Sequence, residues 1–260
     1  MSAATLLIVG LTGCGGSTPS AQPPSSAPPP WIADPAPDAR ADLTARATRA
    51  QDRSYAALYT LDEGNGVTHN VVATVGADRT WRVDVSGGAL GGTADVSITS
   101  VRAGVFQCTM SSPQHPIVPT CIRVADPGKR VPSDYDPKVE RLFRRWLSVF
   151  TDRQSPLSIT AVQPLAGARG TCFSIDSISA SLKAPVDVGI YCYTDDGLLT
   201  AARVAYGVLT LVSEVAGPPT VPLPGPEVQG RPMGMDRPPP APTLPPTMQP
   251  SAAGSPSAGA

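Results

Sequence analysis

The sequence has little net charge and no long apolar run beyond its first residues. Its 260 residues carry a formal net charge of −1, which implies neither a nucleic-acid partner nor a large acidic or basic partner. After residue 14, no apolar run approaches the roughly 18 residues that a membrane-spanning helix requires. We therefore expect no spanning helix in the chain that follows.

Motifs of catalytic and cofactor-binding proteins are also missing. The chain contains no GxSxG nucleophile elbow, no Walker loop, no dinucleotide-binding fingerprint and no HExxH pair. Of its two histidines, His69 falls on an alternating strand pattern and His115 in a proline-rich loop, so both are interpreted as structural or solvent-facing. Asp195-Asp196-Gly197 can be read as a carboxylate pair, but the pattern favours a hairpin turn. We expect no enzyme activity, no cofactor and no metal site.

The first residues contain a motif of exported proteins. Leu11-Thr12-Gly13-Cys14 closes a short apolar run and precedes a flexible Gly- and Ser-rich stretch. It resembles a bacterial lipobox. The resemblance implies that residues 1–13 are a removed signal segment, that Cys14 carries a lipid anchor, and that the protein lies on the extracytoplasmic face of the cell membrane. The alternative is a fragment of apolar signal sequence in which Cys14 is incidental. Abundant Ala, Gly, Pro and Arg are typical of a GC-rich genome such as that of an actinobacterium.

Proline marks the edges of one folded region. Of 31 prolines, 8 lie between Cys14 and Asp38 and 14 lie from Pro218 onward. Segments of Pro, Ser, Ala and Gly bury too little apolar surface to fold. The expected organisation is a Pro/Ser-rich tether (14–40), one folded domain (41–217) and a disordered Pro-rich tail (218–260). The tail is either a recognition segment or, as we favour, a solvated terminus without a partner.

Alternation of apolar and polar residues predicts a mainly β domain. After a short helix in residues 41–52, strands are expected in residues 54–61, 67–75, 81–85, 94–101, 105–110 and 121–124. The alternation returns in residues 157–163, 171–178, 189–194, 198–204 and 208–215. Gly- and Asp-rich turns join several of these segments. The sequence predicts about ten strands arranged as antiparallel meanders.

Residues 137–150 interrupt the alternation. Apolar residues repeat there at helical spacing, at Val139, Leu142, Phe143, Trp146 and Phe150, while Lys138, Arg141, Arg144, Arg145 and Ser148 fall on other faces. Asp136 can cap such a helix, and Pro137 suits its first position because no backbone N–H bond is lost there. One strong amphipathic helix is predicted.

Four cysteines remain after Cys14, and they allow three pairings. We favour Cys108 with Cys121 and Cys172 with Cys192, because each pair joins neighbouring expected strands across a short connection. A zinc site of four thiolates is a poor alternative, because its ligands would come from four strands and no CxxC spacing occurs. Paired cysteines support an exported protein.

The order helix, meander, amphipathic helix and meander, together with the lipobox, resembles the LolA-like lipoprotein carriers and the related mycobacterial LppX and LprG type over residues 41–217. The resemblance implies a mainly β (α+β) fold in which a curved antiparallel sheet, a half-barrel, covers one or two helices and leaves an apolar cavity for acyl chains. The cavity candidates that it implies are Tyr59, Val71, Trp81, Val83, Leu142, Phe143, Trp146 and Phe150.

Two functions from different classes follow. The first is binding or transfer of a lipid or other hydrophobic ligand in the cell envelope, without covalent catalysis and with the amphipathic helix as the lid of the cavity. The second is a structural or adaptor lipoprotein that presents its domain or tail to an envelope protein, in which case the apolar stripe is plain core packing. An apolar pocket of about 300 Å³ or more favours the carrier, and a filled sheet–helix interface favours the adaptor.

Overall fold

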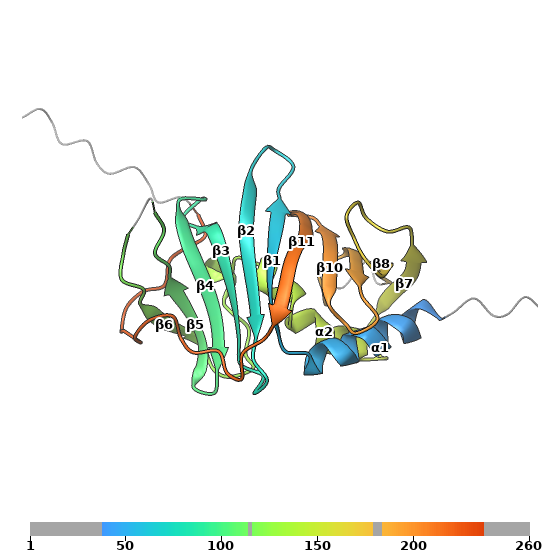
Figure 1. Cartoon of the computed structure of the whole chain (residues 1–260), viewed down its shortest axis with the longest axis horizontal. Helices are drawn as coiled ribbons and strands as arrows, with labels where there is room; N and C mark the ends of the chain where they lie inside the picture. The colour runs from blue at the N-terminus through green and yellow to red at the C-terminus, as the bar shows by residue number, and fades with distance from the viewer. Residues whose placement is uncertain (1–37, 114–115, 179–183, 237–260) are drawn as a thin grey trace, which may run out of the picture. The chain divides into compact units, whose positions relative to one another are not determined.

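The computed structural model describes residues 38–113, 116–178 and 184–236. These residues form one open antiparallel sheet of eleven strands with two α-helices, which confirms the mainly β prediction (Figure 1). The helices are α1 (Ala39–Asp52), the 3₁₀ helices η1 (Ser133–Tyr135) and η2 (Val139–Leu142), and α2 (Arg145–Thr151). The strands are β1 (Tyr55–Asp62), β2 (Thr68–Val75), β3 (Trp81–Ala89), β4 (Ala94–Val101), β5 (Gly104–Thr109), β6 (Cys121–Ala125), β7 (Leu157–Val162), β8 (Thr171–Ser177), β9 (Gly189–Tyr193), β10 (Leu199–Val204) and β11 (Gly207–Ala216).

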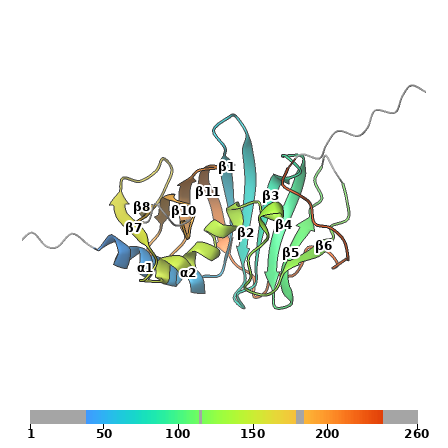
Figure 2. The same ribbon diagram turned by 180° about the vertical axis from the view of Figure 1, so that it is seen from behind.

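Two meanders meet in the middle of the sheet. The strand order is β6-β5-β4-β3-β2-β1-β11-β10-β9-β8-β7, and the meanders are joined by antiparallel pairing of β1 with β11. Strands β6 and β7 follow each other in the chain but lie at opposite edges of the sheet. Residues 126–156, which we call the crossing segment, therefore have to traverse the sheet. Figure 2 shows their helices in front of one face, an arrangement that is consistent with the expected half-barrel.

Helix α1 lies beside α2 on this covered face (Figure 2). It begins at Ala39, two residues earlier than expected, because the Asp38 side chain accepts a hydrogen bond from the backbone N–H of Arg40 at 3.0 Å. Leu43, Ala47 and Ala50 of this helix are buried. Within the described residues, no helix is long and apolar enough to cross a membrane.

The prediction of a single amphipathic helix in residues 137–150 was wrong. Lys138 has a φ of 67°, and Arg144 leaves helical geometry with a φ of −130°, so the segment divides into η2 and α2. Asp136 does accept a hydrogen bond from the Lys138 backbone N–H at 2.7 Å, but its other oxygen binds the Arg141 guanidinium. These local bonds compete with continued helical pairing. The bend lets Phe143 contact Tyr59 of β1 while Phe150 contacts Tyr191 of β9.

Both predicted disulfide pairings are confirmed. Cys108 and Cys121 are bonded across the β5–β6 pair, where the two residues lie directly opposite each other. Cys172 and Cys192 occupy the equivalent relation across β8 and β9. Each meander therefore carries one cross-strand disulfide, and the four cysteines that were candidates for a zinc site are already paired.

Residues 218–236, which we call the C-terminal strap, were wrongly expected to be disordered. The backbone N–H of Ala77 donates a hydrogen bond to the Pro218 carbonyl at 3.0 Å, and that of Cys121 donates to the Pro226 carbonyl at 2.9 Å. Proline can take part in such bonds because it lacks the backbone N–H donor but keeps the carbonyl acceptor. Farther along, Leu90 donates to Gly234 at 3.0 Å. The composition therefore did not predict this region correctly, while residues 237–260 of the expected tail lie outside the described residues.

The strap wraps around the β6 edge of the sheet. Leu223 packs beside Phe106 on one face, and the side chain of Gln107 exchanges hydrogen bonds with the backbone of Met233 on the other, at 2.6 and 2.9 Å. Neighbouring side chains of a strand point to opposite faces of the sheet, so the contacts at Phe106 and Gln107 show that the strap lies against both faces. Between these contacts, Val228 donates to the Cys121 carbonyl at 2.8 Å. The strap thereby covers an edge that would otherwise present unpaired backbone groups.

Candidate ligand-binding site

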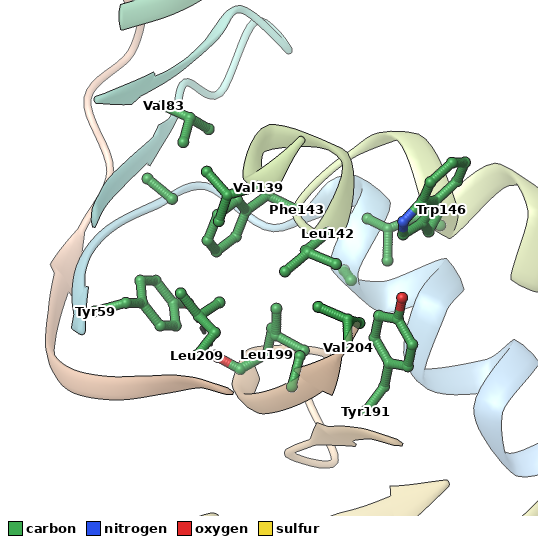
Figure 3. Packing of buried hydrophobic residues seen from close by; sticks show 14 of the residues in the cluster. Tyr59, Val83, Val139, Leu142, Phe143, Trp146, Tyr191, Leu199, Val204 and Leu209 are labelled. Atoms are coloured by element: carbon green, nitrogen blue, oxygen red, sulfur yellow. Dashed lines mark hydrogen bonds between the residues drawn. The ribbon is translucent and has the colours of Figure 1, made fainter. Parts of the chain in front are cut away.

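Six of the eight cavity candidates fill the core instead of lining a cavity (Figure 3). They come from the sheet and from the crossing segment, and each is at most 3% exposed: Tyr59, Val71, Val83, Leu142, Phe143 and Phe150. The Tyr59 and Phe143 rings lie 5.0 Å apart, and the Tyr59 hydroxyl donates to the Leu199 carbonyl at 2.9 Å. None of the six lines any of the three hollows described below. The expected apolar cavity between these residues is therefore corrected to a packed sheet–helix interface.

The other two candidates, Trp81 and Trp146, do line hollows. The inner hollow, about 210 Å³, lies between strands β3 to β5 and the crossing segment, and its walls include Trp81, Val105, Val131, Glu140 and Arg145. The outer groove, about 550 Å³, lies on the other side of Arg145, and its walls include Arg130, Arg141, Trp146, Val186 and Asp187. Arg130, Val131 and Arg145 belong to both, so the two spaces adjoin.

Trp146 is held in place by a polar network. Its indole N–H donates to the Asp187 carboxylate at 3.2 Å, and the Arg141 guanidinium lies 3.7 Å from the other oxygen of Asp187. Arg141 also forms an ion pair with the buried Asp136. On the opposite side, the Arg145 guanidinium lies 5.4 Å from the centre of the Trp146 ring, within cation–π range. The indole is 5% exposed and forms part of both the core and the groove.

Positive charge dominates the inner hollow. Four of its lining side chains are cationic, namely Lys129, Arg130, Arg144 and Arg145, and the acidic one is Glu140. Burial raises the pKa of Glu140 well above its ordinary value of 4.5, and the neighbouring Asp136 raises it further, which favours the uncharged carboxyl. Burial also lowers the pKa of Arg145, and the positive charge of Arg130 lowers it further. An uncharged Glu140 leaves the cations of this hollow without a neutralising carboxylate.

A third hollow, the acidic cleft, has a volume of about 700 Å³. Its acidic lining residues are Glu63, Asp134, Asp136 and Asp236, and its basic ones include His69 and Lys138. His69 is engaged structurally, since its ring nitrogens lie 2.6 Å from the Ser86 carbonyl oxygen and 3.3 Å from a Glu63 oxygen. Across the described part of the chain, no group of His, Cys, Asp and Glu side chains is arranged to hold a metal ion.

Two other sequence candidates need no functional role. Asp195 and Asp196 precede Gly197, whose φ is 88°, in a turn closed by a hydrogen bond from the Thr194 N–H to the Leu198 carbonyl at 3.0 Å. Asp196 forms an ion pair with Arg53, as expected of a polar turn on the surface. His115 and Cys14 lie outside the described residues.

Sequence reasoning missed the residues that line the two hollows from outside the predicted helix and strand β3. Lys129, Arg130 and Val131 follow β6, and Val186 and Asp187 precede β9, so their approach to the residues of α2 depends on contacts distant in sequence. The Arg-rich run at residues 144–145 was visible, but its partner at Arg130 was not. No protein-family model matches the chain, and no curated protein resembles it significantly.

Proposed function

We propose that the protein is an exported, lipid-anchored binding protein that receives an amphiphilic ligand in the adjoining inner hollow and outer groove. The observation that carries this proposal is the combination of arginines and apolar side chains along one continuous surface, with Arg145 at the junction. Such a surface suits a ligand with a polar group and an apolar part. The proposal involves binding without covalent catalysis.

The size of the hollows limits the ligand. The outer groove, at about 550 Å³, falls within the roughly 300–1,000 Å³ of small-molecule sites, whereas the inner hollow, at about 210 Å³, falls below it. The packed interior leaves no room for long acyl chains among Tyr59, Phe143 and Leu142. An apolar part is therefore expected in the outer groove beside Trp146 and Val186, and not deep inside the sheet as in the LolA-like arrangement that the element order resembles.

The proposed location follows from the lipobox. Acylation of Cys14 and removal of residues 1–13 would attach the domain to the extracytoplasmic face of the cell membrane through the tether. The cross-strand disulfides support export, because such bonds persist in oxidising compartments. A membrane-attached domain would meet an amphiphilic ligand at its source.

Mass spectrometry of the full chain purified from its own host tests anchor and ligand separately. A covalent lipid on Cys14 persists under denaturing conditions and is expected to disappear in Cys14→Ala. A bound amphiphile is expected to add mass only under native conditions and to vanish on denaturation. Native and denatured masses that agree for protein extracted in several mild detergents would contradict the ligand proposal, and an unmodified Cys14 would contradict the anchor.

A structural or adaptor lipoprotein is the second candidate, and the packed sheet–helix interface favours it. The ordered strap offers a further surface of the folded domain for a partner. The adaptor predicts no native mass shift from a small ligand and a protein partner captured by cross-linking in the envelope. The two candidates therefore give opposite results in the same native spectrum.

A further inference from the structure

The four cations that line the inner hollow form no ion pair with a carboxylate of the described residues. Among the described residues, Arg46, Arg53, Arg79, Arg82, Arg123 and Arg141 form ion pairs with carboxylates. In the same part of the chain, Lys129, Arg130, Arg144 and Arg145 form none. The inner hollow therefore gathers four cations that have no ion-pair partner around one acidic side chain, Glu140.

Arg144 has a structural role that accounts for its position. Its guanidinium donates to the carbonyls of Ala50 and Gln51, at 3.4 and 3.0 Å, and so caps the last turn of α1. Arg130 and Arg145 have no comparable carbonyl or carboxylate acceptor among the described residues. The cation–π contact with Trp146 orients Arg145 and leaves its N–H donors available.

Arg130 and Arg145 are held close enough to repel each other. The positive charge of Arg130 is a cause of the lowered pKa of Arg145, second only to burial. Arg130 is exposed and Arg145 is half-buried, so water screens part of this repulsion, but the two like charges still raise the free energy of the empty site. A bound anion between them would remove this cost and gain charge-assisted hydrogen bonds.

A buried carboxyl group, that of Glu140, lies beside the two arginines. Glu140 is 4% exposed, lines the same hollow, and its Oε2 has no hydrogen-bond partner among the described residues. A buried polar atom without a partner costs free energy, and a ligand group supplies the missing bond. The proton of the uncharged carboxyl is engaged with Asp136, because a side-chain hydrogen bond to Asp136 is among the causes of the raised pKa of Glu140, so Oε2 remains an acceptor for a hydroxyl group of the ligand.

We infer that Arg130 and Arg145, with Glu140 beside them, form a binding site for a phosphate-type oxyanion at the junction of the inner hollow and the outer groove. Each planar guanidinium can bind two oxygens of an anion, and a phosphate presents more oxygens to two such groups than the two of a carboxylate. This inference rests on the proposed function, since it identifies the polar group of the amphiphile. The phosphate can belong to a lipid headgroup or be free, and the test separates the two.

The direct test is an NMR titration of the ¹⁵N-labelled full chain with inorganic phosphate at constant ionic strength. The Nε–Hε signals of Arg130 and Arg145 are expected to shift together and to saturate. Arg130→Gln and Arg145→Gln are each expected to weaken binding about tenfold or more, as for the loss of charge-assisted hydrogen bonds. Arg153→Gln is the matched control, because Arg153 is exposed, lines none of the three hollows, and changes the net charge equally.

Arg145, and not Arg130, lies over the Trp146 ring, so Arg130→Gln is not expected to disturb the packing of Trp146. If Arg145→Gln fails to fold, Arg130→Gln therefore still tests the inference. Equal weakening by Arg153→Gln would overturn the inference, because it would show general charge attraction. Wild-type affinity in both Arg130→Gln and Arg145→Gln would overturn it as well.

Dihexanoyl-phosphatidylglycerol and dihexanoylglycerol, both below their micellar concentrations, separate the inference from the function on which it rests. We expect the phospholipid to bind more tightly than inorganic phosphate and to lose this affinity in Arg130→Gln. Phosphate binding that depends on both arginines, with no gain from acyl chains, would uphold the anion site while contradicting the amphiphile proposal. Equal binding of both lipids, insensitive to Arg130→Gln, would uphold the amphiphile and overturn the anion site.

Discussion

The two sides of the crossing segment differ in how completely they are packed. On the side that faces β1 and β9, Phe143 and Phe150 contact tyrosine rings and the interface is filled. On the side of Arg145, the crossing segment borders two hollows. The difference shows that an apolar stripe predicts which residues approach the sheet, while the charged residues beside it determine where packing stops. Long guanidinium side chains keep their charged ends near water and cannot fill an apolar interior.

The largest expected effect is on the filled side. Phe143→Ala removes a ring that is 3% exposed and packed against Tyr59, so we expect the free energy of unfolding to fall by about 3–5 kcal/mol. Denaturant unfolding measures it. Ser148→Ala is the control, because Ser148 lies on the exposed part of α2 and its loss is expected to change stability by less than about 0.5 kcal/mol. A loss of less than about 1 kcal/mol in the free energy of unfolding for Phe143→Ala would contradict a tightly packed interior and support the expected apolar cavity.

A pH-dependent effect is expected on the hollow side. The raised pKa means that folded Glu140 keeps its proton while the unfolded chain loses it above about pH 4.5, so Glu140 lowers stability progressively as pH rises toward its folded pKa. Glu140→Gln removes this penalty. We expect the variant to gain on wild type by up to about 1 kcal/mol per pH unit as the pH rises above about 5. Parallel stability curves for the two proteins would contradict a protonated Glu140.

The smallest effect is expected at the boundary between the two sides. Trp146→Phe keeps an aromatic ring in the core but removes the hydrogen bond to Asp187, so the free energy of unfolding is expected to fall by about 1 kcal/mol. Ligand affinity is expected to fall as well, because the indole lines the outer groove. A stability loss as large as that of Phe143→Ala, with ligand binding unchanged, would show that Trp146 acts only in core packing and not in the outer groove.

Local pattern was enough for most of the fold. Alternation along β1 buries Tyr55, Ala57, Tyr59 and Leu61, and neighbouring strands pair in chain order within each meander. Because each cysteine pair lies across adjacent strands, strand adjacency also predicted both disulfides. The wrong predictions arose where local composition competes with distant contacts: the strap, ordered by Gln107 and Cys121, and the crossing segment, divided by the bonds of Asp136.

The sequence by itself determined the period-two strands, the cysteine pairs and the apolar stripe from Val139 to Phe150, because each depends on neighbours or near neighbours in the chain. Only the tertiary structure decided that the stripe fills the interior and that Arg130 and Arg145 line the same hollows beside Glu140, whose Oε2 has no hydrogen-bond partner among the described residues. Those outcomes depend on volumes and charges contributed by residues far apart in sequence. Burial then changes the electrostatics, since a carboxyl at the surface is ionised, whereas the same carboxyl between the sheet and the crossing segment favours its proton.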